Sequence, residues 1–223
     1  SFFTMDRNER VDEFSQSNVR NCIRNIGSFN IRTYPNNYFV YKKIANWLNL
    51  KKENILIADG AEGALLRFMS AFANVKDKVI YLDPSFGMYK VYCDIFRLRK
   101  YPLKLDMKKN FNFFNQLVQH IKKVRPNIII IANPNQPIET MLNFNQIKYL
   151  CEIANKMKIF LVIDEAYYHF NNISAQRYIK KFNNLVVLRT FSKAFGLAGL
   201  RIGYCMSNKK IIAYFDEDGK IKS

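Results

Sequence analysis

The chain has 223 residues, of which 49% are apolar and 15% aromatic, so it can bury the core of one large domain. Its 35 Lys and Arg residues against 18 Asp and Glu give a net charge of +17. The basic residues lie in scattered pairs without a basic arm or a nucleic-acid motif, so we expect no nucleic-acid partner and a surface that attracts small anions.

The length of the apolar runs and the spacing of the cysteines indicate in which cellular compartment the protein works. No apolar run approaches the roughly 20 residues that cross a bilayer, and the first residues lack the apolar core of a secretory signal. The four cysteines lie far apart with no C-x-x-C pattern, which favours neither a disulfide framework nor a zinc site. We therefore expect a cytoplasmic protein with no metal ion and no membrane association.

Hydrophobic periodicity predicts helices alternating with strands. Helical spacing covers residues 38–50, 61–72, 88–96, 113–123 and 145–156. Short apolar runs predict strands at residues 55–58, 78–82, 99–103, 127–131, 159–163, 185–188 and 201–205. Unbroken apolar strands separated by helices are typical of a mostly parallel sheet covered on both faces, so we expect an α/β fold.

Polar loops follow four of the predicted strands, at the edge where open α/β sheets bind ligands. They contain Gly60-Ala61-Glu62, residues 133–137 (Asn-Pro-Asn-Gln-Pro), residues 164–167 (Asp-Glu-Ala-Tyr) and Ser192-Lys193. Each has a structural explanation when taken alone: turn glycine, ordinary loop, helix cap or surface lysine. Their joint occurrence at strand ends favours a ligand site.

The last of these loops suits a phosphorylated aldehyde. Lys193 lies among apolar and aromatic neighbours, where a lysine loses part of its preference for charge and can condense with a carbonyl. Ser192 and Arg201 add a hydroxyl and a guanidinium group, which are donors suited to phosphate. Gly60 and the residues after it open a helix whose free N–H groups suit the same anion.

These motifs, in this order, resemble the pyridoxal-phosphate-dependent aminotransferases of fold type I (class I/II). The resemblance includes residues 84–89 (Pro-Ser-Phe-Gly-Met-Tyr), and its most specific part is the run TFSKAFGLAGLRIG from Thr190 to Gly203. It extends from about Asp6 to Asn208, and within the family it is strongest to the histidinol-phosphate aminotransferases. The resemblance implies the large α/β domain of that family and the cofactor pyridoxal 5'-phosphate.

The resemblance also implies roles for individual residues. Lys193 would join the cofactor aldehyde covalently and carry the substrate proton as general base and acid, Asp164 would face the pyridine nitrogen, and Tyr167 would contact the phenolate oxygen. Phe86 would stack on the ring, and Tyr34 would reach the phosphate of a neighbouring subunit, which implies a homodimer. The cofactor-binding set is Gly60, Ala61, Glu62, Phe86, Asn133, Asn135, Gln136, Asp164, Tyr167, Ser192, Lys193, Arg201 and Tyr34.

Two departures from the family pattern stand out. The usual Asn-Pro-Thr-Gly is Gln-Pro-Ile-Glu at residues 136–139, so Gln136, Asn135 and Asn133 all remain candidates for the phenolate contact. Family members also continue into a small C-terminal domain that supplies an arginine for the substrate carboxylate, whereas this sequence stops at Ser223. The chain is then a fragment or truncated product, or this arginine comes from elsewhere.

The predicted organisation is an N-terminal arm (1–35), a cofactor-binding large domain (36–215) and a polar tail (216–223), with the small C-terminal domain missing. The expected function is amino-group transfer between an amino acid and a keto acid or phosphorylated keto substrate, in amino-acid biosynthesis. Two alternatives remain, namely a decarboxylase of the same fold and a truncated remnant that binds cofactor without turnover. A basic nucleic-acid binder ranks last.

Overall fold

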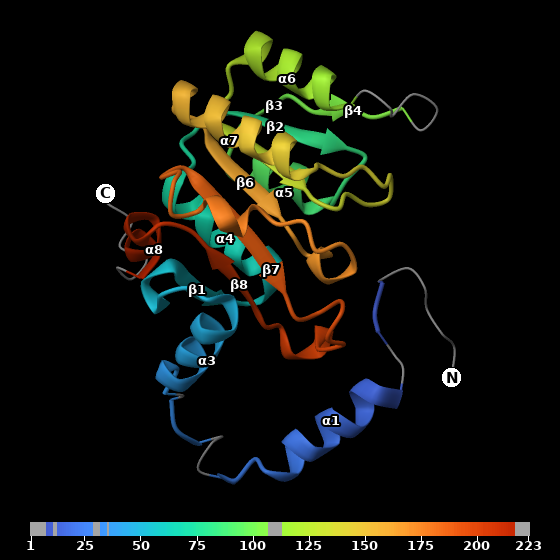
Figure 1. The fold of residues 1–223 in the computed structure, drawn as a ribbon, viewed down its shortest axis with the longest axis vertical. Helices are drawn as coiled ribbons and strands as arrows, with labels where there is room; N and C mark the ends of the chain where they lie inside the picture. Colours follow the sequence, from blue (N-terminus) through green and yellow to red (C-terminus); the bar gives the residue numbers. More distant parts are fainter. Residues whose placement is uncertain (1–7, 11–12, 29–31, 35, 107–112, 217–223) are drawn as a thin grey trace.

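A single mixed sheet organises the chain. The computed structural model describes residues 8–10, 13–28, 32–34, 36–106 and 113–216, and within them a sheet of eight strands forms in the order β1-β8-β7-β6-β5-β2-β3, with β4 also paired to β2 (Figure 1). The strands are β1 (Ile55–Ala58), β2 (Lys78–Asp83), β3 (Arg99–Lys100), β4 (Leu103–Lys104), β5 (Ile128–Ala132), β6 (Phe160–Asp164), β7 (Leu185–Thr190) and β8 (Gly203–Met206).

Strand directions confirm the predicted, mostly parallel α/β sheet. Strands β2 to β7 pair in parallel, whereas β8 runs antiparallel to both β7 and β1. The connecting helices are α1 (Glu13–Arg24), α3 (Tyr38–Leu48), α4 (Gly60–Phe72), α5 (Met88–Ile95), α6 (Phe113–Val124), α7 (Phe144–Met157) and α8 (Lys209–Asp216). Short 3-10 turns are η1 (Lys52–Asn54), η3 (Tyr168–Phe170), η4 (Ala175–Tyr178) and η5 (Ala198–Leu200).

Each central strand feeds two apolar cores because successive side chains point to opposite faces of the sheet. In β6, Leu161 and Ile163 pack into the core formed with α3, α6 and α7, while Val162 packs into the core formed with α4, α5 and α8. Figure 1 shows α7 in front of the strands and α4 behind them. The sheet is therefore the middle of three layers, which explains why its strands read as unbroken apolar runs.

The parallel strands bring distant loops together. The carboxyl ends of β2, β5, β6 and β7 lie at one edge of the sheet, and the segments that follow them start at residues 84, 133, 165 and 191. The N-terminus of α4 reaches the same edge through contacts with β7 and β8. The fold thus places the polar loops singled out by the sequence side by side.

Two predicted strands were wrong in their bounds, and two helices were missed. The strand expected at 99–103 is split into β3 and β4 around Pro102, which has no N–H to donate to a ladder. The last strand begins at Gly203 rather than Arg201, because Arg201 adopts a left-handed conformation with φ of +49° after η5. Helices α1 and α8 were not predicted, and α8 packs Ile211 and Phe215 against the α4 side of the sheet.

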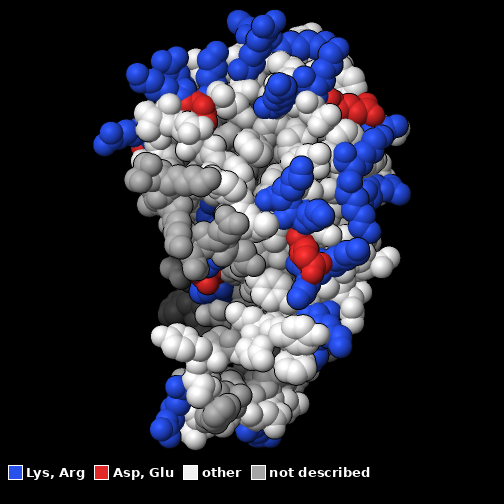
Figure 2. Space-filling model, turned by 90° about the vertical axis from the view of Figure 1, so that its left-hand side faces the viewer, with Lys and Arg blue, Asp and Glu red and all other residues white. Residues whose placement is uncertain are grey.

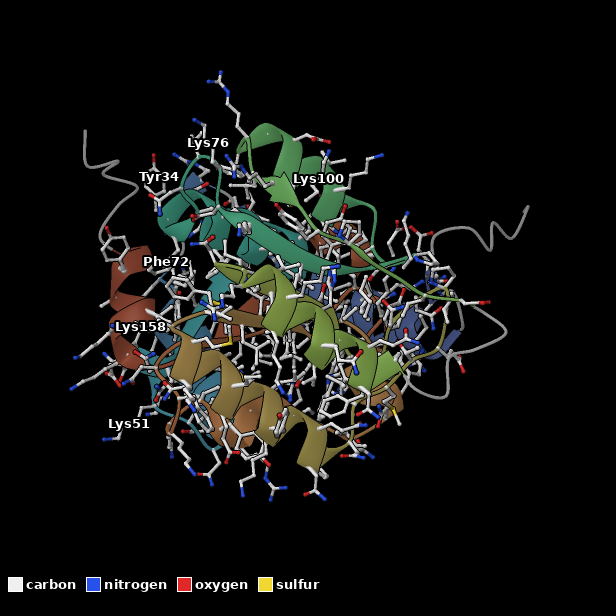
Figure 3. All side chains as sticks on the ribbon, turned by 90° about the horizontal axis from the view of Figure 1, so that it is seen from above. Tyr34, Lys51, Phe72, Lys76, Lys100 and Lys158 are labelled. Atoms are coloured by element: carbon white, nitrogen blue, oxygen red, sulfur yellow. The ribbon has the colours of Figure 1, made fainter. Side chains whose placement is uncertain are left out.

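Basic side chains are dispersed over the surface. On the face shown in Figure 2, Lys and Arg are spread along the upper and right-hand margins, with only a few acidic side chains among them. Lys51 and Lys76 lie at the outer edge in the view of Figure 3. Within the described part of the chain, no helix is long and apolar enough to cross a membrane.

The approach of β8 to α4 leaves no room for a side chain at Gly203. A Cβ atom built on Gly203 would lie 2.4 Å from the carbonyl carbon of Gly60 and 2.7 Å from the backbone nitrogen of Ala61. These distances are far below van der Waals contact, and both neighbours are backbone atoms that cannot rotate away. Gly203 therefore sets how closely the start of α4 approaches the sheet.

We expect Gly203→Ala to lower the free energy of unfolding by about 1–3 kcal/mol, the usual cost of overpacking. Urea denaturation followed by circular dichroism measures the change. Gly199→Ala is the matched control, because a Cβ atom there meets nothing within 4 Å. Equal stability of the two variants would contradict the steric constraint.

Candidate active site

A cavity of about 630 Å³ opens at the carboxyl edge of the sheet. Its wall includes nine of the thirteen residues predicted to bind a cofactor, namely Ala61, Glu62, Phe86, Gln136, Asp164, Tyr167, Ser192, Lys193 and Arg201. The volume lies within the range typical of small-molecule sites. Residues separated by more than 130 positions in the sequence thus meet around one cavity.

One end of the cavity carries donors suited to a phosphate group. Helix α4 starts here, and its N-cap Asp59 makes no side-chain capping hydrogen bond, so the N–H groups of the first turn are not capped by that carboxylate. The backbone N–H of Ser192 donates to the Thr190 hydroxyl over 3.1 Å, and the Thr190 hydroxyl lies 2.9 Å from that of Ser192. A helix N-terminus and two hydroxyl groups therefore converge.

Arg201 completes this end with a guanidinium group. Its Nη2 lies 3.6 Å from Oε2 of Glu62, and a Cβ atom at Gly60 would come within 3.2 Å of the same nitrogen. Gly60 has φ of +77°, a conformation that glycine adopts without strain. Gly60 is not part of the cavity wall, so its contribution is to shape the turn and to leave room for Arg201.

Asp164 is a buried carboxylate at the end of β6. Its side chain accepts a hydrogen bond from the Tyr89 hydroxyl at Oδ2 over 2.7 Å and from the backbone N–H of Ala166 at Oδ1 over 3.0 Å. Burial raises the pKa of Asp164 above its ordinary value, and the two donors oppose that shift. The carboxylate is held in one orientation facing the cavity, where it would attract a protonated ring nitrogen.

Tyr89 belongs to the motif at 84–89, but the sequence assigned it no role of its own. It is fully buried in α5, and its hydroxyl bonds a carboxylate 75 positions away. Burial raises the pKa of Tyr89 well above its usual value, and the Asp164 charge raises it further. Tyr89 therefore stays neutral and donates a hydrogen bond to Asp164.

Lys193 lies on the same wall in a partly buried position. Burial lowers the pKa of Lys193 below its ordinary value; Glu9 opposes the shift and Arg201 adds to it. Its Nζ atom lies 5.8 Å from the centre of the Tyr167 ring. A depressed pKa raises the fraction of neutral amine, which is the form that attacks a carbonyl.

The loop carrying Lys193 rests on an aromatic cluster. Trp47 stacks on His169 at 5.8 Å with an interplanar angle of 11°, and it meets the edge of Phe195 at 6.0 Å. Phe191 lies 5.0 Å from Phe195, so aromatic residues on both sides of Lys193 belong to the cluster. This packing ties helix α3 and η3 to the loop.

The three amide residues that are candidates for the phenolate contact differ in their position in the loop after β5. Asn133 and Asn135 are fully buried: the Asn133 Oδ1 accepts from the Leu142 N–H over 2.7 Å, and the Asn135 Nδ2 donates to the Ile138 carbonyl over 2.9 Å. Gln136 is on the cavity wall. Asn133 and Asn135 thus lie in the loop interior and satisfy buried backbone groups, while the Asn133 Nδ2 has no hydrogen-bond partner among the described residues.

Two aromatic residues of the predicted set differ in position. Phe86 lies on the cavity wall with 43% of its surface exposed, and its ring meets the edge of Tyr89 at 5.6 Å. Tyr34 is fully exposed and is not on the wall (Figure 3). Phe86 is therefore placed to cover a planar ligand within this chain, whereas Tyr34 is available to another molecule.

A buried ion pair lies beneath the site. The Arg189 Nε donates to Glu165 Oε2 over 2.9 Å, and both side chains are almost completely buried. Ser174 bonds both partners, and the Tyr168 ring covers the guanidinium group at 3.6 Å. The pair joins the end of β6 to β7, next to the strand positions of Asp164 and Thr190.

The family model for aminotransferase class I and II matches residues 5–218. The chain belongs to this family. A curated class I and II relative, the histidinol-phosphate aminotransferase of Caldanaerobacter subterraneus subsp. tengcongensis, is 30% identical over 216 residues, or 96% of this chain and 60% of that protein. The chain therefore spans about 60% of the length of this relative.

Solved structures show the same fold. A crystal structure of histidinol-phosphate aminotransferase from Sinorhizobium meliloti in complex with pyridoxal-5'-phosphate superposes with a TM-score of 0.81 at 20% identity, over 95% of this chain and 57% of that one. The enzyme of the same name from Clostridium acetobutylicum has a TM-score of 0.76 at 26% identity, over 97% of this chain and 63% of that one. The large domain of this aminotransferase family is thus the architecture observed.

We expect Asp164→Asn to raise the free energy of unfolding of the ligand-free protein at pH 7 by about 0.5–2 kcal/mol, the usual gain when a functional strain is removed. The folded state holds the Asp164 proton more tightly than the unfolded chain, so stability is lost as the pH rises above the unfolded value of 3.8 toward the raised pKa. The Asn variant lacks this loss, and its advantage should grow from pH 4 to pH 7 in urea denaturation.

The control for this comparison is Asp59→Asn, which removes an exposed carboxylate near the same cavity. Its stability difference from the natural chain should not change in the same way with pH. A pH-independent difference for Asp164→Asn would contradict the assigned burial effect.

We expect Arg189→Leu to cost about 3–5 kcal/mol of unfolding free energy, because it leaves the Glu165 carboxylate buried without its partner. The double variant Glu165→Leu/Arg189→Leu should cost much less than the sum of the two single changes. Guanidinium denaturation of all four chains gives the coupling free energy. Additive effects would show that the pair does not act as a unit.

Proposed function

We propose that this chain is the cofactor-binding large domain of a pyridoxal-phosphate-dependent aminotransferase of the histidinol-phosphate type. The single observation that carries the proposal is one cavity that is lined by Lys193, Asp164, Ser192, Arg201 and the start of α4. A reactive amine, a carboxylate and phosphate donors are the three groups that this cofactor requires. The family membership supports the same conclusion.

The residues present fit the cofactor. Thr190, Ser192, Arg201 and the first turn of α4 would hold its phosphate, and Phe86 would cover one face of its ring. Asp164 would accept a hydrogen bond from the ring nitrogen, because Tyr89 and Ala166 already hold the carboxylate in place. When bound, the cofactor supplies an electron sink for the carbanion formed at the substrate Cα.

Three side chains would carry out the proton chemistry and tune the site. Lys193 would take the proton from the substrate Cα as a general base and would give it up again later in the reaction as a general acid. Its lowered pKa leaves more of the neutral amine that this step needs. Tyr167 would donate a hydrogen bond to the phenolate oxygen, and Gln136 is the amide on the wall that takes the place of the usual asparagine.

The substrate and assembly follow the same reasoning. We infer amino transfer between an amino acid and a phosphorylated keto substrate, as the name of the 30% identical relative indicates. We also infer a cytoplasmic homodimer, in support of which the four cysteines are free thiols and Tyr34 is fully exposed for contact with a second subunit. Residues 36–215 would form the large domain, and residues 1–35 an arm; the tail proposed at 216–223 lies almost entirely outside the described residues.

We expect added pyridoxal phosphate to produce a new visible absorption band, because Lys193 joins the aldehyde covalently, and we expect borohydride to abolish this band while it fixes the cofactor as a stable covalent adduct. Lys193→Ala should lose the band and the reduced adduct, as shown by mass spectrometry. Lys148→Ala, an exposed lysine on α7, is the control that should retain both. A band that persists unchanged in Lys193→Ala would overturn the assignment.

A second measurement separates the related activities. Incubation of the pyridoxal-phosphate complex with an amino donor such as glutamate should convert the absorption to that of the pyridoxamine form if the chain transaminates. Release of carbon dioxide would indicate the decarboxylase alternative instead. Cofactor binding with neither change would favour the remnant that binds without turnover.

A further inference from the structure

Residues 8–10, near the start of the chain, contact two loops of the cavity. One is the loop after β6, which carries Tyr167, and the other is the loop after β7, which carries Lys193. Asn8 donates from Nδ2 to the Tyr167 hydroxyl over 2.9 Å. Arg10 donates from Nη1 to the carbonyl oxygen of Ala194 over 2.7 Å, next to Lys193. Asn8 and Glu9 both form part of the cavity wall. None of these contacts is explained by the roles given to Lys193, Asp164 and the phosphate donors.

The direction of the Asn8 hydrogen bond determines what the Tyr167 hydroxyl can do. A tyrosine hydroxyl has one proton to donate and lone pairs that accept. Because the Asn8 amide donates, it occupies a lone pair of the Tyr167 oxygen and leaves the hydroxyl proton available for an acceptor in the cavity. A donor on the oxygen also polarises the O–H bond and strengthens its own donation.

The backbone of this segment suits an asparagine. Asn8 has φ of +51°, in the left-handed region that Asn and Asp tolerate better than most side chains. Between the two anchors, Glu9 reaches the cavity wall, and its charge raises the pKa of Lys193 against the effect of burial. Asn8 and Arg10 thus hold a charged residue close to the reactive lysine.

We propose that Asn8 is a positioning residue for Tyr167, which fixes the hydroxyl so that its proton points to the phenolate oxygen of the cofactor, and that Arg10 anchors the segment to the Lys193 loop. This inference rests on the proposed function, since it states which partner donates in the hydrogen bond between the Tyr167 hydroxyl and the cofactor. It adds to the site a wall segment that lies more than 150 positions from its partners in the sequence.

The test replaces the hydrogen-bond donor of Asn8 by an acceptor of the same shape. Asn8→Asp keeps the shape and the tolerated backbone conformation, but a carboxylate can only accept, so it draws the Tyr167 proton away from the cavity. We expect it to weaken pyridoxal phosphate binding about tenfold, and Asn8→Ala about threefold, in absorption titrations at equilibrium. The visible band of the bound cofactor should shift in Asn8→Asp, because the phenolate oxygen loses its donor.

A double-mutant cycle separates this mechanism from simple charge repulsion. In a Tyr167→Phe background, both Asn8 changes should lose most of their effect, whereas repulsion of the anionic cofactor by the new carboxylate would remain. Asn25→Asp adds the same charge on an exposed asparagine directly after α1, which does not line the cavity, and should leave binding unchanged.

The anchoring role of Arg10 has its own test. Arg10→Ala should speed hydrogen exchange at the Gly196 amide in the ligand-free protein, since that amide bonds the Lys193 carbonyl.

The outcomes are distinct. Binding by Asn8→Asp that equals the natural chain, or a loss that persists undiminished with Tyr167→Phe, would overturn the positioning role while the Lys193-dependent band still supports the proposed function. An unchanged exchange rate at Gly196 in Arg10→Ala would overturn the anchoring role. Absence of any Lys193-dependent band in the natural chain would overturn the proposed function and this inference with it.

Discussion

The buried contact between Arg189 and Glu165 is the constraint on which the geometry of the cavity depends. It crosses from β7 to β6 at 2.9 Å, one residue beyond Asp164 and one before Thr190. A charged pair in a region of low dielectric is stable only with its partners in place, and Ser174 and Tyr168 supply them. The two strand ends that carry the carboxylate and the reactive lysine loop are thereby held in one register.

The walls of the site are of two kinds. The phosphate end is set by backbone, through the close approach of Gly203 to Gly60, and Asp164 is set by two donors. The rest of the cavity is lined by the exposed Phe86, the half-buried Gln136 and the segment around Asn8. Preorganised donors such as those on Asp164 stabilise charge without having to reorganise.

Much of the fold could be predicted from the sequence because β5, β6 and β7 are apolar on both faces, a pattern that only a covered parallel sheet explains. Lys193 and Asp164 could be placed in one site because each follows a predicted strand, and Arg201 because it belongs to the same motif as Lys193. The side-chain roles were harder to infer. Whether Asn133 and Asn135 face a ligand depends on how the loop turns, and the bond from Tyr89 to Asp164 joins positions 75 residues apart. In the sequence, the one signal of the Arg189 pair is a charged residue directly after the apolar run 185–188.

The aromatic cluster beneath the Lys193 loop has a practical consequence. Trp47 is the sole tryptophan of the chain, and its indole stacks on His169 and touches Phe195, two positions beyond the reactive lysine. The indole fluorescence of the protein therefore originates from a single position, at the base of the loop that carries Lys193. A change in the packing around this loop can be followed through Trp47 in the unlabelled protein.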